Sequence, residues 1–228
     1  MSTLSPGACR LRVRYAKDGR LAHLGHLEVM GTIMRSVRRA GLPFEVSEGF
    51  ARRMRIQFSQ ALPVGASSVA EYYDLLLPEP IDAIQALKEL RASTPSALAP
   101  VATKLLPRRM PALEAWANRA MWDVEIACTT DEAQAFPGEL ARTRERGYLD
   151  FMRGDKPRHL ELGPTLVSCE VLSSARGLRL ALDTRTTEQG SLRPAVLVQA
   201  VMGRPPARVC RLGQWHETED GNLLDPMA

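Results

Sequence analysis

The pattern that most constrains the fold is an abrupt change of hydrophobic period near the start of the chain. Residues 10–15, RLRVRY, alternate arginine with an apolar residue, which is typical of a half-buried β-strand with one arginine-bearing face. After a turn in AKDGR, apolar residues from Leu27 to Val37 recur at helical spacing, and Gly41 and Pro43 end the helix. A strand followed directly by an amphipathic helix predicts a mixed α+β fold.

The same succession of elements continues through residue 107. We expect a short strand over 44–47, an arginine loop, a strand over 55–61 that AEYYDLLL extends or follows, a helix in PEPIDAIQALKELRAS and a closing strand in APVATKLLP. Strand, helix, strand, strand, helix, strand is the order of the split βαβ, or ferredoxin-like, unit. Residues 1–107 are therefore predicted to form a ferredoxin-like domain with a basic helix and an arginine loop.

The rest of the chain repeats this order more loosely. Residues 108–118 read as a connector, and 119–228 as a second domain: a strand, a helix disturbed by Pro137, a basic hairpin-like segment, two strands, a helix beginning near Pro194 and a last strand. We therefore predict an α+β fold of two ferredoxin-like (βαββαβ) units with antiparallel sheets, the second irregular. The order of the elements, and not residue identity, carries the inference of a duplication.

Composition narrows the class of protein. The chain has 228 residues, of which 45% are apolar and 25% charged, as in ordinary globular proteins. No segment approaches the ~20 consecutive apolar residues that cross a bilayer, and the first residues do not resemble a signal peptide. We expect a cytoplasmic protein without a membrane partner. The four cysteines stand singly, unlike the close pairs of metal and redox sites, so neither a metal nor a cofactor is expected.

Positive charge is concentrated at one end of the sequence. The net charge is only +4, yet residues 1–60 contain 11 Lys and Arg against 4 Asp and Glu, and 26 of the 30 basic residues are arginine. A planar guanidinium binds two phosphate oxygens at once and stacks on bases, which an ammonium cannot do. Codon bias in a GC-rich genome is the alternative, but it does not explain the uneven distribution.

The expected fold brings six arginines of the first helix and the following loop toward one region. They are Arg35, Arg38, Arg39, Arg52, Arg53 and Arg55, with a secondary patch at Arg153, Lys156 and Arg158. Such a cluster suits a polyanion, because each neutralised phosphate releases counterions. Phe50, Tyr72 and Tyr73 are candidates for stacking on unpaired bases. The alternative is a solvated loop, with these aromatic side chains in the core.

His26 and Glu28 form the strongest catalytic candidate. In AHLGHLE, His23 and His26 lie at the start of the first helix, and His26 could act on a 2′-hydroxyl as acid or base with Glu28 orienting it. However, His26 also falls on the apolar stripe with Met30 and Ile33, which favours a packed, hydrogen-bonded histidine. Phosphate-loop, zinc-protease and nucleophile-elbow motifs do not occur in the sequence. A non-catalytic protein is therefore favoured.

Several segments resemble a known family. They are LRVRYAKDGRLAHLGHLEVM, RRAGLPFEVSEGF, ALPVGASSVAEYYDLLL, RHLELGPTLV and GSLRPAVLVQAV, in order over nearly the whole chain. Together they resemble the radical-SAM-linked uncharacterised bacterial domain, which is fused to radical-SAM proteins or encoded beside them. The resemblance implies no established activity. It implies a separately encoded radical-SAM enzyme as partner and an accessory role in RNA modification. This chain lacks the three-cysteine cluster motif of such enzymes.

Two departures from the family pattern bear on the site. Members often carry Gly-Phe-Asn-Pro-His-Pro where this chain has GFARRM, so Arg53 replaces the loop histidine and an anion-binding loop is favoured over a catalytic one. The family's Ser-His-Leu-Asp becomes Gly25 to Glu28, which keeps the imidazole and the carboxylate. A fainter likeness, of architecture alone, is to the duplicated ferredoxin-like endoribonucleases that trim CRISPR repeats.

Three functions follow as hypotheses. The first is a non-catalytic accessory module of a radical-SAM system that binds tRNA or rRNA, or presents a substrate to the partner. The second is a metal-independent endoribonuclease-like enzyme that uses His26. The third is a pure protein-docking domain whose arginines only confer solubility.

Overall fold

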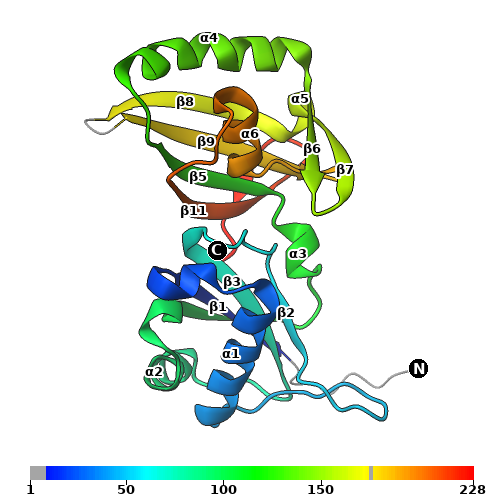
Figure 1. The fold of residues 1–228 in the computed structure, drawn as a ribbon. Helices are drawn as coiled ribbons and strands as arrows, with labels where there is room; N and C mark the ends of the chain where they lie inside the picture. Colours follow the sequence, from blue (N-terminus) through cyan, green and yellow to red (C-terminus); the bar gives the residue numbers. More distant parts are fainter. Residues whose placement is uncertain (1–8, 175–176) are drawn as a thin grey trace.

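The structure is a computed structural model that describes residues 9–174 and 177–228. It is a mixed α+β fold, as the sequence predicts, and Figure 1 shows its two halves stacked one above the other. Among the described residues, no helix is both long and apolar enough to cross a lipid bilayer.

The lower half in Figure 1 is formed by the first part of the chain. It contains β1 (Cys9–Lys17), a 3₁₀ turn (Gly19–His23), α1 (His26–Arg39), β2 (Ile56–Phe58), β3 (Ser67–Leu77), α2 (Ala83–Ser93), a second 3₁₀ turn (Ser96–Leu98) and β4 (Pro100–Pro107). The strands pair in the order β4-β1-β3-β2, and every pairing is antiparallel. Both helices pack on the same face of this sheet, because the apolar side chains of β1 point toward them.

One strand prediction in this half is wrong, and a second strand is shorter than predicted. Residues 44–47 form no strand and contribute only an isolated bridge between Val46 and Met54, so the arginine loop lies between α1 and β2 and not between two strands. The strand expected over 55–61 is only β2, and β3 is separate from it. At Ser59 the backbone N–H donates to the carbonyl of Tyr72, while the N–H of Tyr72 donates to the side-chain hydroxyl of Ser59 and not to its carbonyl.

The upper half follows a short connector that contains α3 (Leu113–Trp116). Its elements are β5 (Arg119–Ile126), α4 (Thr130–Arg146), β6 (Tyr148–Arg153), β7 (Lys156–Glu161), α5 (Leu162–Thr165), β8 (Leu166–Ser174), β9 (Gly177–Thr187), β10 (Gly190–Ser191), α6 (Pro194–Met202), β11 (Arg208–Glu217) and β12 (Leu223–Leu224). Strands β11, β5, β9 and β8 pair in that order, all antiparallel, while β6 and β7 form a separate hairpin. Helix α4 continues through Pro137.

Local sequence signals set where the helices begin. Helix α2 starts after Asp82, whose Oδ1 accepts hydrogen bonds from two backbone N–H groups of the first turn, those of Ile84 (2.8 Å) and Gln85 (3.1 Å). At α4, Thr129 and Glu132 each accept from the other's backbone N–H, which is a capping box. These contacts satisfy N–H groups that have no partner within the helix.

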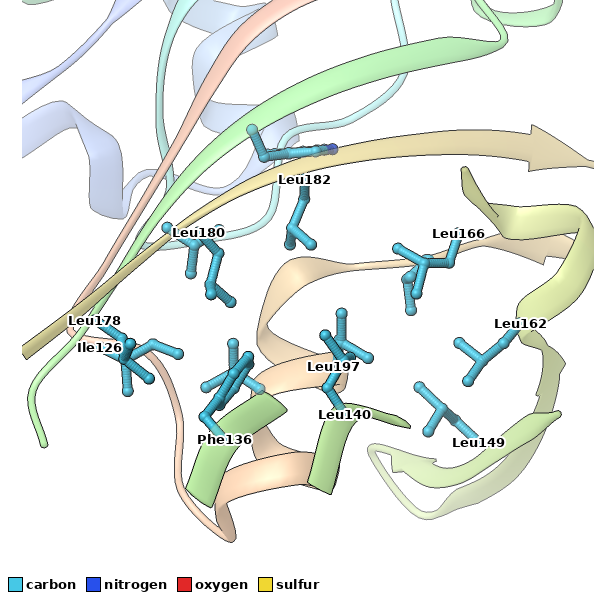
Figure 2. Close-up of a cluster of buried hydrophobic side chains, with 14 of the residues drawn as sticks. Ile126, Phe136, Leu140, Leu149, Leu162, Leu166, Leu178, Leu180, Leu182 and Leu197 are labelled. Carbon is cyan, nitrogen blue, oxygen red and sulfur yellow. The ribbon is translucent and has the colours of Figure 1, made fainter. Parts of the chain in front are cut away.

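The core of the upper half lies between its sheet and its helices. Figure 2 shows Phe136 and Leu140 of α4 and Leu197 of α6 pointing toward Leu180 and Leu182 of β9. Phe136, Leu180 and Leu197 are fully buried. Removing such side chains from water is the main force that closes the helices onto the sheet.

The two halves share one continuous sheet. Strand β11 pairs in parallel with the start of β3, at Cys210–Ser67 and Arg211–Ser68. Arg211 is buried at this junction and donates from Nε and Nη2 to the two carboxylate oxygens of Glu71, at 2.8 and 2.7 Å. Its guanidinium also lies over the ring of Trp122, 5.0 Å from the centroid. A buried, paired charge therefore fixes the register between the halves.

The outward face of the lower sheet is covered, which corrects the expectation of a half-exposed arginine face on β1. Arg10 and Arg12 are 4% and 1% exposed, and both donate to the carboxylate of Asp74. Arg12 also lies beneath the ring of Trp116 of α3 and donates to the carbonyl of Pro226 at 2.9 Å. The connector and the residues after β12 thus cover this face.

Candidate nucleic-acid interface

The arginine loop is a hairpin that projects from the lower half. Its base is closed by the bridge between Val46 and Met54, and Ser47 accepts from the N–H of Arg53 through Oγ and donates its own N–H to the carbonyl of Arg53. Gly49 turns the chain with φ of +107°, which favours glycine. In Figure 1 the segment between α1 and β2 extends away from the sheet. We call residues 46–54 the basic hairpin.

The tip of the basic hairpin carries an aromatic ring beside two arginines. Phe50 is fully exposed, and Arg52 and Arg53 are exposed as well. Within the described residues, neither guanidinium makes an ion pair. The hairpin therefore presents an apolar ring and two guanidinium groups without a described counter-charge to solvent.

Arg55 does not belong to this unpaired group. Glu45 binds Arg55 at 3.1 Å through Oε2 and also binds both terminal nitrogens of Arg108. The carboxylate neutralises much of the charge at the base of the hairpin. Of the three arginines predicted in the loop, two are thus left available for an external anion.

Three further arginines lie on the last turns of α1, as the sequence predicts. Arg35, Arg38 and Arg39 are exposed, and no ion pair to any of them occurs in the described parts of the chain. Arg35 donates to Thr32 Oγ1 at 3.0 Å. Cations here are favoured by the negative end of the helix dipole, which accounts for their position without a ligand.

The predicted secondary patch does not form one surface. Lys156 and Arg158 lie exposed on the β6–β7 hairpin, whereas Arg153 at the end of β6 lines a cavity between the two halves. His159 on the same hairpin bonds the carboxylates of Asp150 and Glu161, at 2.8 and 3.0 Å, and these contacts raise the pKa of the imidazole. Acidic groups thus accompany the basic ones, so this hairpin is a weaker site for a polyanion.

Tyr72 and Tyr73 are not available for stacking on bases. They are 3% and 2% exposed, and burial raises the pKa of Tyr72 to about 12. Tyr73 packs in the core against Tyr15 and Phe58. Of the three aromatic candidates, only Phe50 is accessible, because the strand that carries the tyrosines lies in the middle of the sheet.

His26 and Glu28 are each engaged in contacts that hold the start of α1. Glu28 Oε2 accepts from the backbone N–H of Gly25 at 2.8 Å. The ring of His26 packs edge-on against Phe58, with centroids 5.8 Å apart. Within the described residues, no hydrogen bond joins the imidazole to the carboxylate. Next to His26 lies Lys17, a buried residue that sequence reasoning missed, whose pKa is lowered by burial.

Sequence reasoning also missed the cavity between the halves. Its lining combines residues of the lower half, the β6–β7 hairpin and the segment before α6, including Arg193. These segments lie far apart in the sequence, so no local pattern marks them as neighbours. The single local signal is an arginine immediately before Pro194, at the start of a helix.

Comparison with solved structures finds weak similarity. An archaeal box H/ACA sRNP Nop10–Cbf5 complex has a chain 9% identical, with a TM-score of 0.40, over 88% of this chain and 46% of that one. A Cbf5–Nop10–Gar1 complex gives 9% identity and a TM-score of 0.44, over 92% and 50%. An unknown protein from Galdieria sulphuraria gives 13% and 0.23, over 78% and 80%. This chain spans about half the length of the first two, and similarity at this level supports no functional argument.

Comparison with protein families gives a clear assignment. No curated protein matches the chain. The model of the family described as "Uncharacterized protein conserved in bacteria (DUF2344)" matches residues 10–194, which is most of the sequence. The matched region includes α1, the basic hairpin and the start of α6. This chain therefore belongs to that uncharacterised bacterial family.

Proposed function

We propose that this protein binds RNA through the basic hairpin and the neighbouring end of α1, as a non-catalytic accessory module. The observation that carries the proposal is the tip of the hairpin, where exposed Phe50 stands beside Arg52 and Arg53, for which the described residues provide no ion pair. Guanidinium groups that are already solvated and unpaired gain phosphate contacts without breaking existing ones, and each contact releases counterions.

The aromatic ring argues for unpaired bases. Stacking of a base on an aromatic side chain is worth about 1–3 kcal/mol and requires a base that is not already stacked within a duplex. Phe50 at the tip is accessible on all sides, since its side chain is fully exposed. A loop or single-stranded segment of tRNA or rRNA is therefore the substrate class that we propose.

Other broad surfaces of the protein are less suited to RNA. The outward face of the lower sheet is covered, and on the upper sheet Arg179 and Arg208 already pair with Asp123 and Glu125. The contacts of His26 and Glu28 likewise favour a structural role at the start of α1 over acid–base catalysis. These observations support binding by the hairpin without cleavage.

The test is fluorescence anisotropy with labelled tRNA and rRNA fragments at about 50 and 200 mM salt. We expect binding that weakens steeply with salt, and we expect the double variant Arg52→Ala/Arg53→Ala to lower the slope of log affinity against log salt by about 1 to 2. The control, Arg142→Ala/Arg144→Ala on α4, removes the same formal charge from an exposed helix elsewhere and leaves binding nearly unchanged.

Phe50→Ala separates stacking from charge in the same assay. This variant should weaken binding by about 1–3 kcal/mol with an unchanged salt slope, because stacking releases no counterions. Equal losses in the hairpin and control variants would show that the affinity reflects net charge alone. Binding insensitive to salt, or no binding at all, would reject the proposal.

We also propose that a separately encoded radical-SAM enzyme is the partner of this module; the sequence resemblance supports this. If the enzyme and this protein co-purify after nuclease treatment and at high salt, they dock directly and not through RNA.

In addition, we propose that both halves are ferredoxin-like units. In each, the last strand pairs with the first, the first with the third and the third with the second, once the β6–β7 hairpin is treated as an insertion.

A further inference from the structure

We propose that the cavity between the two halves binds a phosphate-bearing ligand, with Arg153 and Arg193 as its anion contacts. The cavity has a volume of about 370 Å³. Gln60 and Glu114 line it from the lower half and the connector, while Arg153, Ser191 and Arg193 line it from the upper half. A volume in this range corresponds to a small ligand such as a nucleotide, and sites of this kind commonly lie between domains.

Arg153 and Arg193 both line the cavity, and both side chains are exposed to solvent. Partial burial lowers the pKa of Arg193, and the positive charge of Arg153 lowers it further. Neither guanidinium makes an ion pair within residues 9–174 and 177–228. Glu114 is the acidic side chain of the lining, and it is exposed on the connector. Two arginines that line one cavity without a described counter-ion are stabilised by an anion bound there.

A third, buried guanidinium also lines the cavity. Arg211, which is 2% exposed, lines it, and its hydrogen bonds to Glu71 and to the carbonyl of Gln60 use Nε and Nη2. Nη1 of the same guanidinium has no hydrogen-bond partner among the described residues. Trp122 beneath it donates to Thr184 Oγ1 at 2.9 Å, which fixes both side chains. The third guanidinium is thus held in place before any ligand arrives.

The chemistry favours phosphate over a single carboxylate. A phosphate offers three oxygens and up to two negative charges, so it can accept from two guanidinium forks at once. A carboxylate carries a single negative charge, which balances only one of the two guanidinium groups. The phosphate could belong to a free mononucleotide or to the end of an RNA strand, and both would present the same group to Arg153 and Arg193. The site does not depend on the basic hairpin, and so stands apart from the proposed RNA surface.

Isothermal titration with AMP, and with adenosine as the ligand without phosphate, tests the site. We expect AMP to bind and adenosine not to bind. We expect Arg193→Ala and Arg153→Ala each to weaken AMP binding by about tenfold or more, the effect of removing a charge-assisted hydrogen bond. Arg193→Lys keeps the positive charge but loses the planar guanidinium that can donate to two oxygens at once, and should give an intermediate affinity. Arg144→Ala on α4 is the matched control, and Glu114→Gln should strengthen binding.

A second arm distinguishes the source of the phosphate. A hexaribonucleotide is titrated with and without a 5′-phosphate, against the unmodified protein and Arg193→Ala. If the phosphorylated strand binds more tightly, and only in the presence of Arg193, the ligand is an RNA end, even if AMP binds poorly. Failure of both AMP and the phosphorylated strand to bind, or binding unchanged by Arg193→Ala, would overturn the proposal. Arg52→Ala/Arg53→Ala should leave AMP binding unchanged, so failure of either proposal can be recognised separately.

Discussion

The outward sheet faces of the two halves use arginine in opposite ways. In the lower half, Arg10 and Arg12 of β1 are almost completely buried and share the carboxylate of Asp74. In the upper half, Arg179 and Arg208 are 51% and 54% exposed and pair across strands with acidic residues of β5, and only Arg119, which binds Asp183 and Glu217, is nearly buried among the arginines described on this face. Yet the four main strands of each half pair in an equivalent order.

The difference comes from what covers each face. Trp116 of α3, together with Pro226 and Met227, packs over the lower sheet, and Met227 joins a small apolar cluster with Tyr72 and Leu113. On the upper face Met121 and Leu212 remain 43% and 47% exposed. For Arg10, Arg12, Arg179 and Arg208, exposure thus follows whether a segment outside the sheet covers the face.

The largest effect should follow from Asp74→Asn. This change leaves the guanidinium groups of Arg10 and Arg12 buried without a counter-charge, which typically costs about 3–5 kcal/mol of folding free energy. Urea unfolding followed by circular dichroism measures the loss. If the variant is as stable as the unmodified protein, the covered face is wetter than the burial of its side chains indicates, and the contrast between the two faces fails.

A smaller effect is expected at high pH from Tyr72 on the covered face. Burial, with Asp225 nearby, raises the pKa of Tyr72 to about 12. The unfolded chain ionises this phenol near pH 10, so its contribution is intact below that pH and is lost as the pH rises toward 12, by about 2–3 kcal/mol. Tyr72→Phe should lose less stability than the unmodified protein between these two pH values. Equal pH dependence in urea unfolding would contradict this.

The smallest effect is expected on the open face. Glu125 and Arg208 are 48% and 54% exposed and pair at 2.8 Å. Glu125→Gln should therefore lower the free energy of unfolding by less than about 1 kcal/mol, because solvent screens such pairs. Adding salt should abolish the difference. A loss as large as that of Asp74→Asn would mean that the two faces are energetically alike.

Much of the fold follows from local patterns. Alternation in RLRVRY, the helical spacing of apolar residues up to Val37 and proline at the start of α6 correctly indicate a strand and two helices, although Leu27 itself is exposed. The error at 44–47 arises because the backbone partners of these residues cannot be read from a strand pattern. The N–H of Glu45 donates to the carbonyl of Leu76, and the carbonyl of Glu45 accepts from the N–H of Arg55. Such pairings depend on the folded sheet and leave no periodic trace.

Prediction of the site was limited in the same way. The sequence places Arg52 and Arg53 in a loop, and the structure finds them exposed beside Phe50. In the sequence, however, nothing distinguishes these exposed arginines from Arg10 and Arg12, which are buried. The residues that cover Arg10 and Arg12 lie about a hundred or more positions later in the chain. The cavity with Arg193 was missed for the same reason, because segments of both halves form its walls.

The buried pair between Arg211 and Glu71 has a consequence for how the molecule is made. The two residues are 140 positions apart, so closing this contact is entropically expensive and belongs among the slow steps of folding. During synthesis the lower half emerges well before β11, so Glu71 has no ion pair with Arg211 until β11 has been made. Pro226, which covers Arg12, comes later still. Strand β1 therefore gains part of its cover only once Pro226, 214 positions after Arg12, has been synthesised, and until then its arginine face stays more open to water.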